Sequence, residues 1–156
     1  MLGSLARKLR AFGLDTVYFR SGDDKDLLSL SRFTGRLILT SDRGLAEVGE
    51  TIPQVRIIIL EGRTDSERIE SLRLELLRLK VLLRFGDRRC SICNGRLNEI
   101  GKSSAVGSVP VGVVARHRRF FKCDECGQWY WYGSHWKKLR SLEKKLRKTP
   151  HVIDSS

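Results

Sequence analysis

The chain has 156 residues, 40% of them hydrophobic, enough to bury the core of one medium domain or two small ones. No stretch approaches the roughly 18 to 20 apolar residues that cross a bilayer. The N-terminal segment lacks the continuous apolar centre of a signal peptide. These features argue against a membrane protein and predict a soluble, cytoplasmic one. Residues 86–156 hold 15 Lys and Arg against 6 Asp and Glu, most of the net charge of +12. A strongly basic half indicates a polyanion partner, although an inert basic surface would have the same composition.

The first half of the chain alternates between helical and strand patterns. Apolar residues at helical spacing predict helices at residues 4–12, 24–34, 43–49 and 65–84. Apolar, β-branched or aromatic runs predict strands at residues 16–19, 36–40 and 55–60. Strands that are apolar throughout and lie between helices are typical of a parallel sheet covered on both faces. The sequence therefore predicts an α/β domain.

The helix predicted at 65–84 carries one apolar stripe, formed by Ile69, Leu72, Leu76, Leu79 and Leu83. Its residues lie three and four apart, the spacing of one helix face. Core packing explains this stripe without any partner. The same stripe would also serve as the seam of a homodimer, and the sequence leaves that alternative open.

All four cysteines lie in two CxxC pairs, Cys90 with Cys93 and Cys123 with Cys126. Two thiolates at this spacing approach one ion from a short turn, and four thiolates form a closed tetrahedral zinc site. The interval between the pairs suits a zinc ribbon. An iron–sulfur cluster or a redox disulfide is the alternative. Because four protein thiolates leave no open coordination position, we expect a structural role.

Aromatic and basic residues gather around the second cysteine pair. The aromatic residues are Phe120, Phe121, Trp129, Tyr130, Trp131, Tyr132 and Trp136. Alternation along a strand at 129–132 places the two Trp residues on one face and the two Tyr residues on the other. One face would then cover the zinc while the other stacks on bases.

The segment 101–109 is the loosest stretch, and residues 135–148 predict a basic helix that either caps the fold or binds phosphates.

Five motifs occur in order: MLGSLARKLRAFGLDT, DDKDLLSLS, RLILTSDRGL, CSICNGRL and FFKCDECGQWYWYGSHW. Together they resemble the Mut-seven C-terminal RNase domain family over about residues 1–140. In this family a PIN-like nuclease domain is fused to a zinc ribbon. The resemblance implies a PIN-like parallel sheet flanked by helices at residues 1–85. A small zinc ribbon with a basic C-terminal helix would follow at residues 86–156.

The resemblance also implies an acidic catalytic site that holds Mg²⁺ or Mn²⁺. Asp42, in LTSD, matches the acid that follows a strand, and Asp24 matches the acid that opens a helix. Asp23 is the neighbour that would substitute for Asp24. Each of these carboxylates has helix capping as its alternative role. Asp15, in GLDT, matches a family position that we interpret as structural.

The family pattern begins before MLG, with a short strand that carries an Asp two residues upstream of the Met. The sequence given begins at that Met, so the domain is N-terminally truncated as given: either its start was assigned at an internal Met, or the protein lacks this strand and one acid of the site. In the second case we expect an exposed edge or gap in the sheet. Ser41 also stands where the family often has Arg.

RNA is the partner that the resemblance implies. The expected contacts are Arg7, Arg10, Arg43, Arg118, Arg119, Lys122, Trp131 and His135. The first three match basic positions that would face the scissile phosphate, and His135, in GSHW, would contact RNA or cap the ribbon. The favoured function is a metal-dependent ribonuclease. The alternatives are a non-catalytic RNA-binding protein on a degenerate PIN-like fold and a structural module without affinity for nucleic acid.

Overall fold

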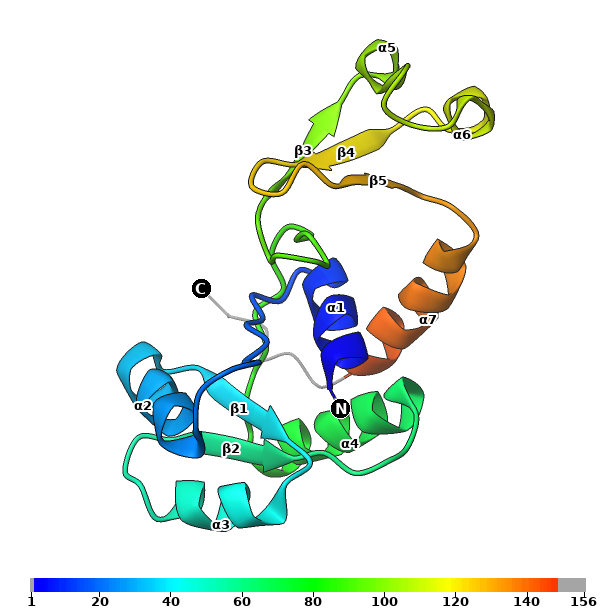
Figure 1. Ribbon diagram of the computed structural model, residues 1–156. Coiled ribbons are helices and arrows are strands. Elements are labelled where there is room, and N and C mark those ends of the chain that lie inside the picture. Colours follow the sequence, from blue (N-terminus) through cyan, green and yellow to red (C-terminus); the bar gives the residue numbers. More distant parts are fainter. Residues whose placement is uncertain (1, 149–156) are drawn as a thin grey trace, which may run out of the picture. The chain divides into compact units, whose positions relative to one another are not determined.

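A computed structural model describes residues 2–148 of the chain (Figure 1). By their contacts the described residues form two compact units. The sheet unit contains residues 2–5, 18–82 and 145–148, and the cysteine unit contains residues 6–17 and 83–144. The domain boundary predicted after residue 85 stays a prediction, and residues 149–156 of the second predicted domain lie outside the described part.

The sheet unit is built on two parallel strands, β1 (Leu37–Thr40) and β2 (Arg56–Ile59). Their register pairs Leu37 with Arg56 and Thr40 with Ile59. The helices α2 (Asp24–Thr34) and α3 (Arg43–Glu50) surround β1 in sequence. Leu28, Ile38 and Leu45, one from each of α2, β1 and α3, form a buried cluster. The predicted α/β domain with a parallel sheet is thus confirmed.

The helix α4 (Asp65–Arg78) is shorter than the predicted helix at 65–84. Its C-cap residue is Leu79, and Lys80 then adopts a left-handed conformation, with φ of 52°. The backbone N–H of Val81 donates to the carbonyl of Leu76, which closes the helix end. The apolar pattern continues past this stop, and for that reason the predicted boundary was wrong. Figure 1 shows α3 and α4 on opposite sides of β2.

The apolar stripe of α4 is buried within a single chain at its centre. Ile69, Leu72 and Leu76 are each at most 1% exposed, whereas Leu79 is 40% exposed. Core packing therefore accounts for the central part of the stripe. The homodimer seam stays a prediction.

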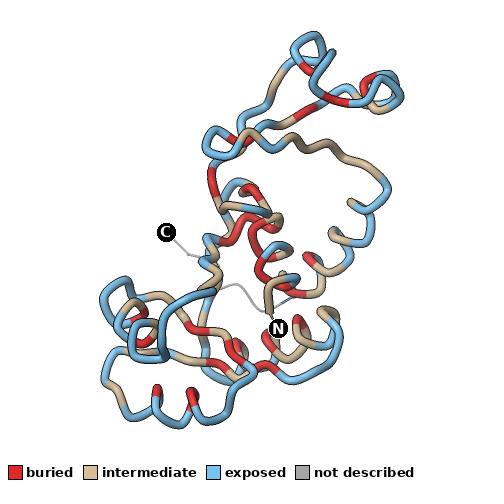
Figure 2. Tube along the Cα trace, in the orientation of Figure 1, coloured by how far each residue is buried: buried red, intermediate tan, exposed pale blue. Residues whose placement is uncertain are grey.

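The cysteine unit contains an antiparallel sheet of β3 (Leu97–Ile100), β4 (Phe120–Cys123) and β5 (Trp129–Trp131), with β4 in the middle. Between β3 and β4 the chain forms two short helices, α5 (Lys102–Ala105) and α6 (Val111–Arg116). Ala105, Val109 and Val114 pack with Phe120 in a second buried cluster, and Figure 2 shows the buried positions of this segment. The stretch expected to be loose is therefore ordered by a small core.

Two helices contribute to both units. They are α1 (Gly3–Ala11), divided after residue 5, and α7 (His135–Arg147), divided after residue 144. The helices predicted at 4–12 and 135–148 are thereby confirmed with small shifts at their ends. None of the helices in residues 2–148 combines the length and apolar character needed to cross a membrane.

The strand predicted at residues 16–19 does not form. A strand needs a neighbouring backbone to complete its hydrogen bonds. At Thr16 the backbone N–H instead donates to the side-chain oxygen of Asn94, at 3.2 Å. The β-branched composition of this segment predicted a local preference that the surrounding structure overrides.

Candidate metal centre and acidic edge

The four cysteines of the cysteine unit meet in one cluster. All four Sγ atoms lie within 4.8 Å of one another. The Sγ atoms of Cys90 and Cys126 are 3.5 Å apart, and those of Cys93 and Cys123 are 3.4 Å apart. Tetrahedral zinc with Zn–S bonds of about 2.3 Å requires sulfurs roughly 3.8 Å apart. The cluster therefore fits a metal ion such as zinc, and the sequence prediction of a four-cysteine zinc ribbon is consistent with this geometry.

Each cysteine pair belongs to a tight turn of the same kind. The residue after the second cysteine, Asn94 in one turn and Gly127 in the other, has φ near +72°. The backbone N–H of this residue donates to the carbonyl of the first cysteine, Cys90 or Cys123, at 2.9 and 3.1 Å. Asn and Gly are the residues that adopt this left-handed conformation most readily. The CxxCN and CxxCG motifs thus build two matched turns around the ion.

Protons are distributed unequally among the thiols. Burial opposes ionisation of Cys90, but the backbone amide of Cys93, the hydroxyl of Tyr130 and the backbone amide of Ile92 together lower its pKa to about 6. Burial raises the pKa of Cys93 to about 12. The backbone amides and the Tyr130 hydroxyl therefore favour the thiolate form of Cys90, which is the form that binds a metal ion.

Tyr130 connects β5 to the first turn. Its hydroxyl lies 3.0 Å from the Sγ of Cys90 and 3.1 Å from the Oγ of Ser91. Burial raises the pKa of this phenol to about 12, which keeps it protonated and able to donate. Trp129 and Trp131, on the other face of β5, pack against the cluster around Phe120. The alternation predicted for this strand therefore separates a metal side from a core side.

The expected RNA contacts of the cysteine unit occupy different environments. Arg118, Lys122 and His135 are exposed, and the ammonium of Lys122 lies 5.4 Å from the ring centre of Trp129. Arg119 is also exposed but donates to both carboxylate oxygens of Glu99, at 2.7 and 2.6 Å. Trp131 is half-buried against the core cluster, which leaves less of its ring for a base.

The two arginines of α1 that were predicted to contact RNA differ in their exposure to solvent. Arg7 is exposed, whereas Arg10 is only 7% exposed. The guanidinium of Arg10 donates to the backbone carbonyls of Thr16, Ser91 and Ile92 at distances between 2.7 and 3.0 Å. In this arrangement Arg10 holds the first cysteine turn instead of presenting its charge to a phosphate.

Asp42 lies directly after β1, where the sequence places it. Its Oδ1 accepts the backbone N–H of Leu45 at 3.1 Å and caps α3. Its Oδ2 has no hydrogen bond or ion pair with any residue in the range 2–148. Asp23 caps α2 in a reciprocal pair with Asp26, while Asp24 is exposed in the first turn of that helix. Asp42 therefore caps α3 with Oδ1 while its Oδ2 is available to another ligand.

A second acid lies at the same edge of the sheet and was missed by sequence reasoning. Glu61 follows β2 as Asp42 follows β1, and Thr40 is paired with Ile59 at the end of the ladder. The signal that identifies Asp42, the first acid after an apolar strand, also identifies Glu61. Glu61 forms an ion pair with Arg43 at 3.3 Å, with both side chains largely exposed.

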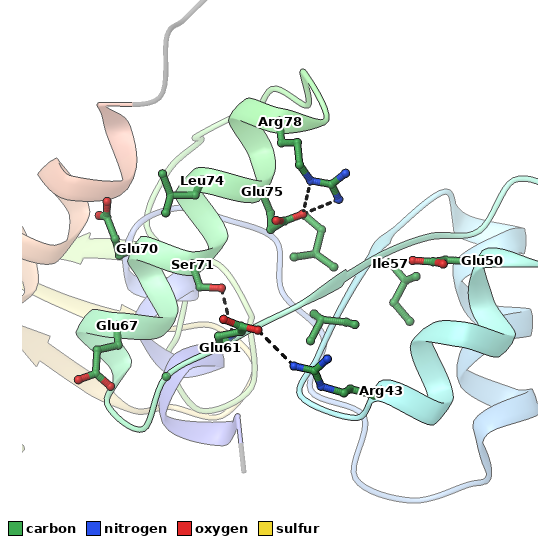
Figure 3. Close-up of a pocket in the computed structure, with 13 residues that line it drawn as sticks. Arg43, Glu50, Ile57, Glu61, Glu67, Glu70, Ser71, Leu74, Glu75 and Arg78 are labelled. Atoms are coloured by element: carbon green, nitrogen blue, oxygen red, sulfur yellow. Dashed lines mark hydrogen bonds and ion pairs between the residues drawn. The ribbon is translucent and has the colours of Figure 1, made fainter.

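Glu61 borders a pocket of about 610 Å³ beside β2. Figure 3 shows the side chain of Glu61 between Arg43 on α3 and Ser71 on α4. Other carboxylates line this pocket, but Glu75 pairs with Arg78 at 2.7 Å and Glu70 with Arg73 at 2.5 Å. The charges of Glu70 and Glu75 are thus balanced by arginines, and Glu67 accepts the backbone N–H groups of Arg63 and Thr64. Glu50, which also lines the pocket, forms no ion pair with a residue in the range 2–148.

The cysteines are the only group of three or more potential metal ligands that meet in the described range. Asp23, Asp24 and Asp42 are not gathered in this way, and their catalytic role stays a prediction. A search of curated proteins and a search of solved structures each found no match. The model of the family described as the Mut7-C RNAse domain matches residues 1–142. With nearly its whole length matched, and with the cysteine cluster and the acid after β1 that its motifs predicted, the chain belongs to the Mut7-C RNAse domain family.

Proposed function

We propose that this chain is a metal-dependent ribonuclease whose acids lie in the sheet unit and whose cysteine unit contacts RNA. Membership in an RNase domain family indicates the ribonuclease function. The observation that carries the choice of site is Asp42, whose Oδ1 caps α3 while its Oδ2 is left without a partner among residues 2–148. A carboxylate oxygen in this position is a ligand that Mg²⁺ or Mn²⁺ prefers.

The donor set fits a weakly held ion better than a preformed site. Mg²⁺ is commonly bound through one or two carboxylates together with substrate phosphates. Asp42 with Asp24 would offer two carboxylates, and the further candidates are Asp23, which caps α2, and Glu61, which follows β2. When bound, the ion would supply charge neutralisation and an activated water. The residues of the chain would hold that ion and orient the scissile phosphate, with Arg43 supplying positive charge beside it.

The decisive experiment compares Asp42→Asn with Glu47→Gln, which removes the same charge from an exposed position of α3. Asn caps a helix as well as Asp does, so both variants should retain the stability of the unmodified chain. Cleavage of labelled single-stranded RNA with Mn²⁺ should fall more than about 100-fold in Asp42→Asn only, because even outer-shell changes cost 10- to 100-fold. Equal cleavage by the two variants would remove Asp42 from the site.

The alternative is a non-catalytic RNA-binding protein. It is favoured by one observation, that the described residues do not assemble three carboxylates around a common point. RNA binding without Mn²⁺- or Mg²⁺-dependent cleavage by the unmodified chain would establish it.

RNA contact by the cysteine unit is tested separately from cleavage. Arg118 and Lys122 are exposed, and neither forms an ion pair with a residue in the described range. Substituting either with Ala should weaken RNA binding and reduce the salt dependence of the affinity by about one charge. The matched control is Lys25→Ala on α2, another exposed cation. Unchanged affinity and salt dependence in both variants would place the RNA contact elsewhere.

A further inference from the structure

Arg10 reaches the first cysteine turn from α1, about eighty residues away in sequence. Its Nη1 donates to the carbonyl of Ser91 at 3.0 Å and to the carbonyl of Ile92 at 2.7 Å. Its Nε donates to the carbonyl of Thr16 at 2.8 Å. The side chain is buried, at 7% exposure, and these three residues lie in the cysteine unit with it. A buried cation held this way fixes the position of the carbonyls that it contacts.

The two carbonyls that Arg10 contacts belong to the two peptide groups that follow Cys90 in the cysteine turn. The carbonyl of Ser91 and the amide of Ile92 form one peptide group, and the carbonyl of Ile92 and the amide of Cys93 form the next. The backbone amides of Ile92 and Cys93 lower the pKa of the Cys90 thiol, the effect expected of N–H groups that face its sulfur. Arg10 therefore holds the oxygen ends of two peptide groups whose N–H ends favour the same thiolate.

The physical effect of this arrangement is both geometric and electrostatic. A peptide group is planar, so fixing its oxygen also fixes the direction of its N–H. A cation at the oxygen end polarises the group and strengthens the hydrogen bond at the other end. Partners one step beyond the ligands orient a metal site and are commonly worth 10- to 100-fold in affinity.

We propose that Arg10 is the positioning residue of the four-cysteine metal centre, holding the Ser91 and Ile92 carbonyls so that their peptide groups are directed at the sulfur of Cys90. It makes no contact with the ion itself. This role is independent of the ribonuclease function, and it assigns the buried arginine of the LARKLR segment to the metal centre instead of to nucleic acid.

The test uses the full chain with Arg10→Gln, Arg10→Lys and, as a matched control, Arg32→Gln at an exposed position of α2. Zinc release to an excess of chromogenic chelator is followed after mixing. Arg10→Gln should release zinc about 10- to 100-fold faster than the unmodified chain. The rate of zinc release from Arg10→Lys should lie between the rates of these two proteins, because an ammonium keeps the charge but lacks the planar guanidinium with its several donors. Arg32→Gln should match the unmodified chain.

A second readout distinguishes positioning from general loosening of the fold. In the ¹¹³Cd-substituted protein, the amide protons of Ile92 and Cys93 should show couplings to cadmium across their hydrogen bonds to sulfur. In Arg10→Gln these couplings should weaken while the far-ultraviolet circular dichroism stays unchanged.

Three outcomes would overturn the proposal. The first is a folded Arg10→Gln that releases zinc at the unmodified rate. The second is faster release with the two couplings intact, which would show a loosening elsewhere. The third is the absence of both couplings in the unmodified chain, a result that needs no variant to fold. Should Arg10→Gln fail to fold with excess zinc, Arg10→Lys decides by the same two readouts.

Discussion

The hydroxyl of Tyr130 lies 3.0 Å from the Sγ of Cys90 and accepts the backbone N–H of Ser91 at 3.2 Å. The contact with the sulfur lowers the pKa of Cys90 and raises that of Tyr130, the pattern of a phenol that donates to a thiolate. Tyr130 of β5 thereby stabilises the thiolate of Cys90, which belongs to the first cysteine turn. This contact joins β5 directly to one of the four cysteines of the metal centre.

Replacing Tyr130 with Phe should therefore weaken metal binding. The pKa of Cys90 should rise from about 6, because a donor to its thiolate is lost, and zinc affinity should fall about 10- to 100-fold at neutral pH. Competition with a chromogenic chelator measures this. Tyr132→Phe is the matched control, since the ring of Tyr132 packs against Phe121 and Trp136. Equal affinities of the two variants would contradict the role of the hydroxyl.

A substitution at Gly13 should destabilise the cysteine unit strongly. Gly13 has φ of +89°, and a Cβ atom there would lie 2.1 Å from the carbonyl oxygen of Gly86. Gly107 has a similar φ of +82° with nothing within 4 Å of a Cβ. Gly107→Ala should cost about 1–2 kcal/mol for its left-handed backbone. Gly13→Ala should cost a further ~1–3 kcal/mol for the steric overlap, as measured by urea unfolding with zinc bound.

Asn94 offers a way to separate backbone conformation from hydrogen bonding. Its side chain donates to Asp15 at 2.7 Å and accepts the backbone N–H of Thr16 at 3.2 Å. Asn94→Gly keeps the left-handed turn but loses both bonds, so the free energy of unfolding should fall by about 1–3 kcal/mol. Asn94→Ala should lose about 1–2 kcal/mol more. Equal stabilities of the two variants would show that the turn tolerates Ala.

The first turn of α4 should give a pH-dependent contribution to stability. Backbone amides of Thr64 and Arg63 donate to the carboxylate of Glu67 and lower its pKa below 4.5. The carboxylate therefore stabilises the fold above the ordinary pKa, and this contribution is lost as pH falls through the lowered value. Glu67→Gln should be less stable than the unmodified chain at pH 7, and the gap should close in acid. Denaturant unfolding of both proteins at each pH measures the gap, and a constant gap would contradict the assignment.

Local patterns in the sequence predicted what local contacts determine. The helix at Asp24–Thr34 begins at a capping Asp and ends at Gly35, and both signals can be read from the sequence. The cysteine cluster was predicted because two CxxC turns favour only a few arrangements around one ion. Asp42 was placed correctly after its strand because an apolar run followed by an acid is a sequential pattern.

Features that depend on distant contacts were not predicted. The charge and helical position of Arg10 suggest a solvated or phosphate-binding residue, and only its partners around position 91 show otherwise. Residues 16–19 have the composition of a strand but lack a neighbouring strand in the described residues. The ordered segment of α5 and α6 depends on Phe120, which follows it in sequence.

The cysteine unit draws on two stretches of chain, residues 6–17 and 83–144, and this division constrains the order of events during synthesis. Arg10 leaves the ribosome long before the turn that it holds, and the ion cannot be enclosed until Cys126 has emerged. Chains are synthesised at about 5–20 residues per second, so residues 6–17 wait on the order of 10 s until the second stretch of the cysteine unit has been made. Throughout that interval the buried guanidinium and the apolar side of α1 are exposed, so nascent chains starved of zinc should be the ones that chaperones and proteases encounter.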